Sequence, residues 1–270
     1  MGGQIAYQAA LHAWDVRLIS RRRESLDLAH ADAAKVLRRR VEKGRLDRDA
    51  CEAALDRVQR SSDYSLIAGA SVVIESVAED RDIKREVTMR VAEHVDDDAI
   101  IGTNSSTLPS SMFEDCVSHP SRLLNVHFFN PPLVMALVEV VRGAHTSEQS
   151  VHHAMEFARA IGKTPVLVAR ETYGFIANRI LFIAMQEAMR LAQEGYVSVE
   201  DCDLAVHNAL GWPLGPFALA DLVGLDVVQA ILEEGARQTG DDRWAPLPLL
   251  RDRVARGELG RKTGRGFNVS

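Results

Sequence analysis

Short β-branched segments alternate with helix-like stretches through the first two thirds of the chain, and this alternation restricts the fold more than any other feature. Because parallel strands need a crossover connection, usually a helix, strands that alternate with helices indicate βαβ units. The sequence therefore predicts an α/β fold with a Rossmann-like, doubly wound and mainly parallel sheet. The strands are expected at residues 16–19, 71–77, 99–102, 122–129, 138–141 and 165–168.

Strand signals stop after Glu171, and the remaining chain has helical patterns. We expect a dinucleotide-binding domain over residues 1–170, with a helical insertion at about 25–60 that carries no strand signal and breaks near Gly44. An all-helical second domain is expected over residues 171–270. Its helices are predicted at 175–194, 199–210 and 216–236, with a short one after residue 247.

Charge and cysteine content exclude several classes of protein. Lys and Arg total 32 against 38 Asp and Glu, and this net charge of −6 argues against a nucleic-acid-binding protein. Cys51, Cys116 and Cys202 are far apart and form neither a zinc motif nor a disulfide framework, which favours a reducing compartment. No metal-ligand spacing, membrane-length apolar run or signal-peptide pattern is visible, so a cytoplasmic protein without a metal site is expected.

A histidine and a carboxylate in two neighbouring strands are the leading catalytic candidates. His127 ends a hydrophobic strand, and a lone histidine there is more often structural. Glu139, however, lies inside the next apolar strand, where a carboxylate is unfavourable unless it is paired. If the two strands are adjacent, Glu139 would fix the His127 tautomer and make the imidazole a competent general base.

Other polar side chains mark the predicted ends of strands and helices. Asn104 and Ser106 follow the strand at 99–102, where α/β folds bind ligands, although a helix N-cap cluster is the alternative. Asn178 lies in a hydrophobic helix and needs a partner, which a neighbouring helix could equally provide.

The N-terminus has the pattern of the second half of a dinucleotide-binding unit. Gly2 opens a helix that precedes the strand at 16–19, while the preceding strand and two further glycines of a full fingerprint are absent, so a flexible N-terminus is the alternative. Ser20 and Arg21 stand where an acidic residue usually binds the NAD ribose. Serine and arginine can receive a 2′-phosphate, which favours NADP, although a solvated basic turn is equally compatible.

An ordered set of motifs runs along nearly the whole chain. The set resembles the L-3-hydroxyacyl-CoA dehydrogenase family, particularly its short-chain 3-hydroxybutyryl-CoA members. The motifs are Val-Ile-Glu-Ser-Val-Ala-Glu at 73–79, Asn-Ser-Ser at 104–106, His-Phe-Phe-Asn-Pro at 127–131, Val-Glu-Val at 138–140, Gly-Phe-Ile-Ala-Asn-Arg at 174–179, Gly-Trp-Pro-Leu-Gly-Pro at 211–216, Ala-Asp-Leu-Val-Gly-Leu-Asp at 220–226 and Lys-Thr-Gly-Arg-Gly-Phe at 262–267.

The resemblance implies roles for individual residues. His127 would be the base that takes the proton from the substrate 3-hydroxyl, Glu139 would hold it, and Ser106 would bind the reacting oxygen. Asn178 would complete the site, and Lys84 could also touch CoA. The residues expected around the NAD or NADP cofactor are Gly2, Ser20, Arg21, Glu79, Lys84, Asn104, Asn130 and Lys262.

The resemblance also implies an acyl-CoA substrate, a place in fatty acid metabolism and a homodimer formed through the helical domain. Two alternatives remain at this point. One is a related hydroxy-acid dehydrogenase of the gulonate type, and the other is a non-catalytic remnant that binds CoA or a nucleotide.

The family fingerprint, Gly-x-Gly-x-Met-Gly, is present here only from its methionine onward. The missing first strand would normally lie in the middle of the sheet, so its neighbours would keep unpaired backbone groups. We expect Met1 to be an internal methionine of a working protein that is longer by roughly a dozen residues, the length of one strand and its turn.

Overall fold

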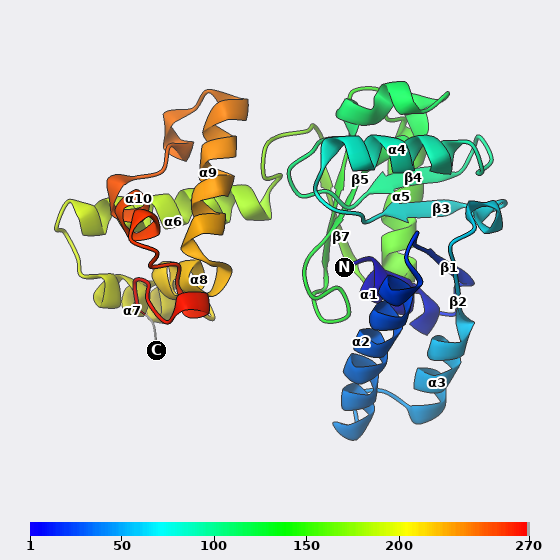
Figure 1. Cartoon of the computed structure of the whole chain (residues 1–270), viewed down its shortest axis with the longest axis horizontal. Coiled ribbons are helices and arrows are strands. Elements are labelled where there is room, and N and C mark those ends of the chain that lie inside the picture. The colour runs from blue at the N-terminus through cyan, green and yellow to red at the C-terminus, as the bar shows by residue number, and fades with distance from the viewer. Residues whose placement is uncertain (269–270) are drawn as a thin grey trace. The chain divides into compact units, whose positions relative to one another are not determined.

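The computed structural model describes residues 1–268 and divides the chain into two compact units, Met1–Thr172 and a second that begins at Tyr173. Figure 1 draws the first as strands covered by helices and the second as helices. The prediction of a Rossmann-like α/β fold followed by an all-helical part is confirmed.

The larger unit contains two sheets. In the larger sheet the order is β3-β4-β5-β6-β7, and every pairing is parallel except β5 with β6. The smaller sheet consists of the parallel pair β1 and β2. The strands are β1 (Val16–Ile19), β2 (Val58–Ser61), β3 (Val72–Glu75), β4 (Ile100–Thr103), β5 (Leu123–Phe128), β6 (Leu137–Val141) and β7 (Thr164–Val168).

Strand β2 contradicts the expectation that residues 25–60 carry no strand. Its sequence, Val-Gln-Arg-Ser, has a single β-branched residue, so the local pattern is weak. The strand forms because Val58 is buried and the backbone pairs in register with β1, which is a tertiary effect. The rest of this segment consists of two helices, and Gly44, whose φ is +64°, lies between them.

Helices cover both faces of the sheets. Side chains of α1 and α5 pack with β4, β5 and β6 on one face, and α4 packs with β4 on the other. The helices of this unit are α1 (Gly2–Leu11), α2 (Arg23–Glu42), α3 (Arg48–Arg57), α4 (Arg81–Ala92) and α5 (Glu148–Ala160), with the 3₁₀ turns η1 (Tyr64–Ile67), η2 (Ser110–Cys116) and η3 (Pro120–Arg122).

The smaller unit packs its helices around a core that includes Phe182, Met185, Phe217 and Trp244. The prediction of a single helix over 216–236 is wrong. Gly224, whose φ is +102°, divides this segment into α8 and α9. Its elements are α6 (Ala177–Gln193), α7 (Val199–Leu210), α8 (Pro216–Val223), α9 (Leu225–Thr239), α10 (Pro248–Ala255), η4 (Asp242–Trp244) and η5 (Arg261–Thr263).

Among residues 1–268, no helix combines the length and the apolar character that a membrane crossing requires.

Candidate active site

The centre of the site is a histidine–carboxylate pair on β5 and β6, the two inner strands of the larger sheet that pair antiparallel. In the β5–β6 register His127 lies directly opposite Glu139, so the two side chains leave the same face. Nδ1 of His127 is 3.0 Å from Oε2 of Glu139, and both side chains are buried. The carboxylate holds the ring in the tautomer that carries its proton on Nδ1 and directs Nε2 away from the pair.

Ser106 meets the other ring nitrogen. It lies in the loop after β4, and its Oγ is 3.1 Å from Nε2 of His127. The ring of Phe129 packs on the imidazole with a centroid distance of 4.6 Å. Ser106, His127 and Glu139 thus form a hydrogen-bonded chain that ends at a hydroxyl.

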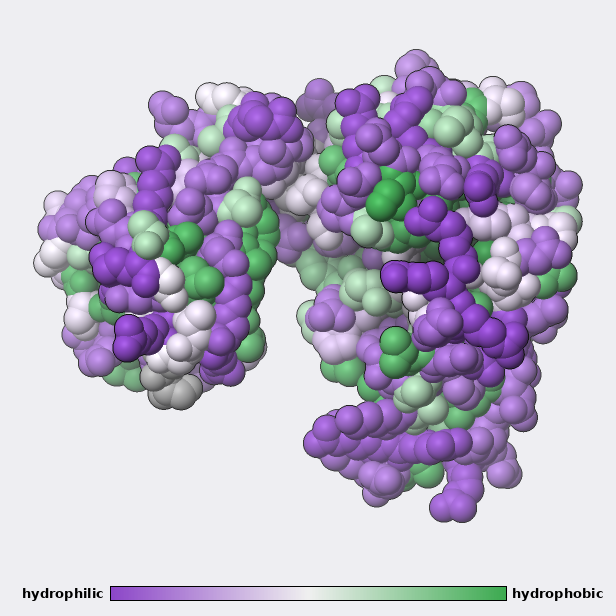
Figure 2. All heavy atoms as spheres, viewed as in Figure 1, coloured by the Kyte–Doolittle hydropathy of each residue, from purple (hydrophilic) through white to green (hydrophobic). Residues whose placement is uncertain are grey.

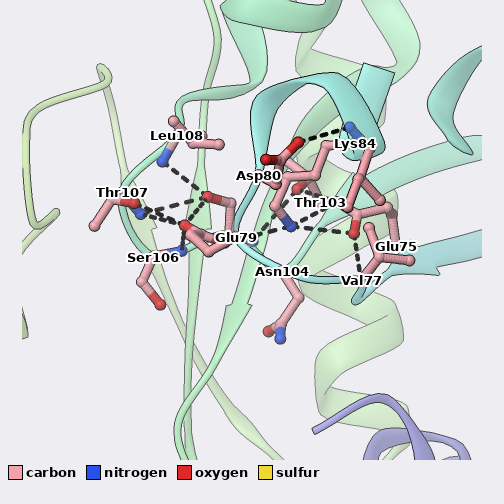
Figure 3. A network of polar contacts seen from close by, with 12 residues as sticks. Glu75, Val77, Glu79, Asp80, Lys84, Thr103, Asn104, Ser106, Thr107 and Leu108 are labelled. Atoms are coloured by element: carbon pink, nitrogen blue, oxygen red, sulfur yellow. Dashed lines mark hydrogen bonds and ion pairs between the residues drawn. The ribbon is translucent and has the colours of Figure 1, made fainter. Parts of the chain in front are cut away.

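Glu79 organises the loop that carries Ser106 (Figure 3). Its Oε1 accepts hydrogen bonds from the backbone N–H groups of Ser106, at 3.1 Å, and Thr107, at 3.0 Å, and from the Thr107 hydroxyl at 2.8 Å. Burial alone would raise the pKa of Glu79, but hydrogen bonds from Ser105 and Thr107 and the ammonium of Lys84 lower it below the usual 4.5. Glu79 therefore remains ionised and keeps the loop in place.

Behind this loop, a buried ion pair joins α4 to the end of β3. Nζ of Lys84 lies 3.1 and 3.0 Å from the two carboxylate oxygens of Glu75, and the lysine side chain is only 1% exposed. Glu75 also accepts hydrogen bonds from Thr103 Oγ1 and from the backbone N–H of Val77. Nζ of Lys84 is 3.4 Å from Glu79 as well.

This location changes the interpretation of Lys84. We expected it at the cofactor, where it could also touch CoA, but its ammonium is paired with two carboxylates of the chain and is shielded from solvent. An exposed ligand phosphate cannot reach such a group without breaking the pair. Lys84 instead supports the loop of Ser106 through Glu79.

Other predicted residues occupy the same edge of the larger unit. Asn104 accepts a hydrogen bond from the backbone N–H of Phe128 through its Oδ1, at 2.8 Å, and so ties the end of β4 to β5. Asn130 is exposed and precedes Pro131 through a cis peptide bond. Gly2 is the first residue of α1, and a Cβ there would lie 3.1 Å from Cβ of Ser76.

A dinucleotide fits the residues at the carboxyl ends of β1 and β3. Gly2, Ser20 and Arg21 line one cavity of about 940 Å³, and Arg21 makes an exposed ion pair with Glu86, at 3.7 Å. The hydroxyl of Ser76, just after β3, is buried without a hydrogen-bond partner among the described residues. Helix N-termini and guanidinium groups suit phosphates. Gly2, Ser20 and Arg21 are thus the residues that would hold NAD or NADP.

Two predicted site residues belong to the smaller unit. Asn178 is the second residue of α6 and is half-buried. Lys262, in η5, donates to Asp226 and lies 3.3 Å from the position a Cβ on Gly224 would take. Within residues 1–268, no group of three or more His, Cys, Asp and Glu side chains could hold a metal ion.

Asn125 was not predicted, although it shares the face of His127. It is fully buried, accepts from the backbone N–H of Ser110 at 2.8 Å and donates to the carbonyl of Leu108 at 3.1 Å. The signal was present in the sequence, because an amide two residues before His127 in an apolar strand must point the same way. Its bonds hold the segment that follows Ser106.

Family comparisons match both parts of the chain. Residues 1–172 match the family described as 3-hydroxyacyl-CoA dehydrogenase, NAD binding domain, and residues 174–270 match the 3-hydroxyacyl-CoA dehydrogenase C-terminal domain. A probable 3-hydroxybutyryl-CoA dehydrogenase of Deinococcus radiodurans is 36% identical over 99% of this chain and 95% of its own. A protein of the same description from Bacillus subtilis is 35% identical over 99% of this chain and 93% of its own.

Solved structures give the same picture. The (S)-3-hydroxybutyryl-CoA dehydrogenase of Ralstonia eutropha is similar with a TM-score of 0.95 and 33% identity, over 100% of this chain and 95% of its own. The 3-hydroxybutyryl-CoA dehydrogenase of Escherichia coli K12 has the same TM-score of 0.95 and the same identity of 33%, and the match covers 57% of that chain.

Proposed function

The chain belongs to the 3-hydroxyacyl-CoA dehydrogenase family and is an NAD-dependent oxidoreductase, and from its site geometry we propose that His127 is the general base for the 3-hydroxyl of a (3S)-3-hydroxyacyl-CoA. The observation that carries the proposal is the chain of contacts from Ser106 through His127 to Glu139, at 3.1 and 3.0 Å. The products of oxidation are the 3-oxoacyl-CoA and the reduced cofactor.

The chain's own residues would handle the proton and the orientation of the substrate. The bound nicotinamide accepts the hydride from C3, or returns it in reduction. Nε2 of His127 takes the proton of the 3-hydroxyl as the C3–H bond breaks, and the Ser106 hydroxyl donates a hydrogen bond to the same oxygen. Glu139 stabilises the imidazolium that results, and its burial strengthens this interaction. Asn178 is proposed to complete the site from α6.

Substitution of His127 by glutamine tests this role. The variant His127→Gln keeps a side chain of similar size but cannot take a proton, so kcat with acetoacetyl-CoA should fall by about 10²–10⁴ while KM changes little. The control is His152→Gln, which alters an exposed histidine on α5. Equal turnover in the His127 variant and the parent would favour the non-catalytic CoA- or nucleotide-binding alternative.

A short-chain acyl-CoA, such as 3-hydroxybutyryl-CoA, is the proposed substrate, with a place in fatty acid metabolism. The support is that relatives named as 3-hydroxybutyryl-CoA dehydrogenases align over nearly the whole chain. The basic end of α2, with Arg38, Arg39 and Lys43, offers a surface for CoA phosphates. Activity with a free sugar acid but not with acetoacetyl-CoA would favour the gulonate-type alternative.

We also propose that the cofactor site accepts NADPH better than is usual for a site with an acidic ribose ligand. Ser20 and Arg21 stand at the carboxyl end of β1 and offer a hydroxyl and a cation to a 2′-phosphate. Ser20→Asp would repel that phosphate and bind a ribose hydroxyl. The ratio of kcat/KM for NADPH to that for NADH should therefore fall by about tenfold or more in this variant. An unchanged ratio, or a strong NADH preference in the parent, would show that the 2′-phosphate is not bound here.

A reducing, cytoplasmic compartment is proposed from the cysteines. Cys51, Cys116 and Cys202 are all buried and free, and burial raises the pKa of each thiol. Free buried thiols are usual for proteins that are not exposed to an oxidising environment.

A further inference from the structure

Glu171 ties the chain after β7 to the segment that follows Ser106, and the proposed mechanism does not use it. It lies in the connector of residues 169–176, which leads from β7 to α6. Its Oε1 accepts hydrogen bonds from the hydroxyl of Ser110, at 2.8 Å, and from the backbone N–H of Ser111, at 2.9 Å. The partners are 61 and 60 residues apart in the sequence, so these bonds join two distant segments.

The surroundings of Glu171 are unusual for a carboxylate in a connecting segment, which water would ordinarily solvate. Hydrophilic side chains cover much of the face of the larger unit that Figure 2 draws. Glu171 is instead half-buried, and its partner Ser110 is only 1% exposed. Hydrogen bonds to a charged group are stronger than neutral ones, and partial burial strengthens them further. The contact can therefore hold the two segments together.

Ser110 extends this contact to the strand β5. Its backbone N–H donates to Oδ1 of Asn125, at 2.8 Å. Nδ2 of Asn125 donates in turn to the carbonyl of Leu108, at 3.1 Å. Ser110 thus contacts both Glu171 and the amide that fixes the segment directly after Ser106.

A glycine makes the contact close-packed. Gly143 follows β6, and a Cβ at this position would lie 2.7 Å from Oγ of Ser110 and 3.4 Å from Oε1 of Glu171. The backbone approaches the two side chains more closely than another residue would allow. They therefore have little room to take other partners. We call Glu171, Ser110, Ser111 and Gly143 the connector junction.

The Ser106 loop therefore has two separate supports. Glu79 accepts hydrogen bonds from the backbone N–H groups of Ser106 and Thr107, and the connector junction holds the chain from Ser110 onward. Between these supports, Oγ of Ser106 lies 3.1 Å from Nε2 of His127. A displacement of about 1 Å at a reacting group can lower a rate by about a hundredfold. Both supports are thus expected to matter for turnover.

We propose that Glu171 is a positioning residue for the dehydrogenase reaction. Through Ser110 it fixes the far end of the loop and so holds the hydroxyl of Ser106 at His127. The inference rests on the proposed function for what Ser106 does. Neither Glu171 nor Ser110 is among the described residues that line the cavity assigned to NAD or NADP. Loss of Glu171 should therefore lower kcat and leave cofactor binding unchanged.

Hydrogen exchange tests the connector junction without turnover. The full-length parent and its variants are compared by mass spectrometry over peptides that span residues 104–112. Glu171→Ala removes the acceptor and should speed exchange there by at least about fivefold. Glu171→Gln keeps an oxygen acceptor and should stay within about twofold of the parent. Arg170→Ala, which removes an exposed side chain of the same connector, is the control and should also stay within about twofold.

Steady-state kinetics with acetoacetyl-CoA gives a second readout. In Glu171→Ala, kcat should fall by about ten- to a hundredfold, while KM for NADH stays within about twofold and Glu171→Gln recovers most of the loss. A fold that is merely damaged would also change KM for NADH. In Ser106→Ala the positioned hydroxyl is already gone, so adding Glu171→Ala should lower kcat by less than about a further twofold.

Unchanged exchange in Glu171→Ala, or equal acceleration in Arg170→Ala, would overturn the proposal. A full further loss of kcat in the Ser106→Ala background would also overturn it, because Glu171 would then act through the connector and not through Ser106. If Glu171→Ala does not fold, Ser110→Ala, which deletes one hydroxyl, replaces it in each comparison. A parent without turnover would contradict the proposed function alone, and the exchange result would still decide whether the connector junction holds the loop.

Discussion

At the scale of single residues, the buried pair of Lys84 and Glu75 is the support on which the loop of Ser106 depends. The ammonium bonds to both oxygens of Glu75 and approaches Glu79, which in turn accepts from Ser106 and Thr107 (Figure 3). The charges are far from solvent, so they stabilise the fold only as a complete pair. The loop geometry thus depends on a residue of α4 that lies outside the loop.

We predict that Lys84→Met lowers the free energy of unfolding by about 3–5 kcal/mol, because it leaves the Glu75 carboxylate buried without its cation. The double variant Glu75→Gln, Lys84→Met removes both charges and should regain much of this loss. Urea unfolding measures both, with Arg90→Met, an exposed member of α4, as the control. A loss under 1 kcal/mol in Lys84→Met would mean that the pair is not buried in solution.

Sequence reasoning recovered part of this site. The pairing of His127 with Glu139 follows from two apolar strands that each carry one unfavourable polar residue, which is a local signal. The interior position of Lys84 has no local signal, because its partner belongs to another element and only the packing of α4 on β3 brings them together.

At the scale of elements, the sequence pattern predicts each strand whose own residues favour extended structure. It does not predict β2, which forms because it pairs with β1. Strands β1 and β3–β7 are rich in Val, Ile and Leu. Strand β2 has one such residue and forms by pairing with β1. The division of α8 from α9 was missed for the converse reason, since apolar helical spacing continues across Gly224 while its backbone turns.

Lys163, the residue directly before β7, holds the segment between β5 and β6 in place. Nζ of Lys163 donates to the carbonyls of Pro132, at 2.5 Å, and Met135, at 2.9 Å. Burial, together with Arg40, lowers the pKa of Lys163 to about 8 from its usual 10.5. Between pH 8 and 10.5 the folded state has therefore released a proton that the unfolded state keeps.

We predict that the free energy of unfolding of the parent rises between pH 8 and 10.5 relative to that of Lys163→Met, which has no group to titrate there. The free energy of unfolding rises with pH because the unfolded state binds more protons than the folded state in this window. Below pH 8 the lysine is charged in both states, and the unfavourable burial of its charge is fully present. Urea unfolding at several pH values measures the difference, with Lys35→Met on α2 as an exposed control. Parallel curves for the parent and Lys163→Met would contradict the shift.

At the scale of the whole molecule, exposed apolar side chains of the smaller unit indicate self-association. Ile180 on α6 is 61% exposed, and Leu204 and Leu210 on α7 are 60% and 67% exposed. Ile180 also lines an apolar hollow of about 380 Å³ with Leu181, Trp212 and Leu214. Exposed apolar side chains and an apolar hollow are typical of subunit interfaces, and we propose a homodimer formed through this unit.

We predict that the chain sediments as a dimer and that Ile180→Asp shifts it to the monomer, because a carboxylate at a buried interface would lack a partner. The matched control is Leu28→Asp on α2, where a leucine is 65% exposed in the other unit. Analytical ultracentrifugation reports both. A parent monomer, or a dimer that survives Ile180→Asp, would place the contact elsewhere or exclude it.

The proposed catalytic pair, His127 and Glu139, is also a pair of strand partners, so activity is expected to depend on the register between β5 and β6. If β6 slid by one residue along β5, Glu139 would move to the opposite surface of the sheet, although the helices and most of the core would remain. On heating or in mild denaturant, catalytic activity should therefore be lost before circular dichroism shows any loss of helix.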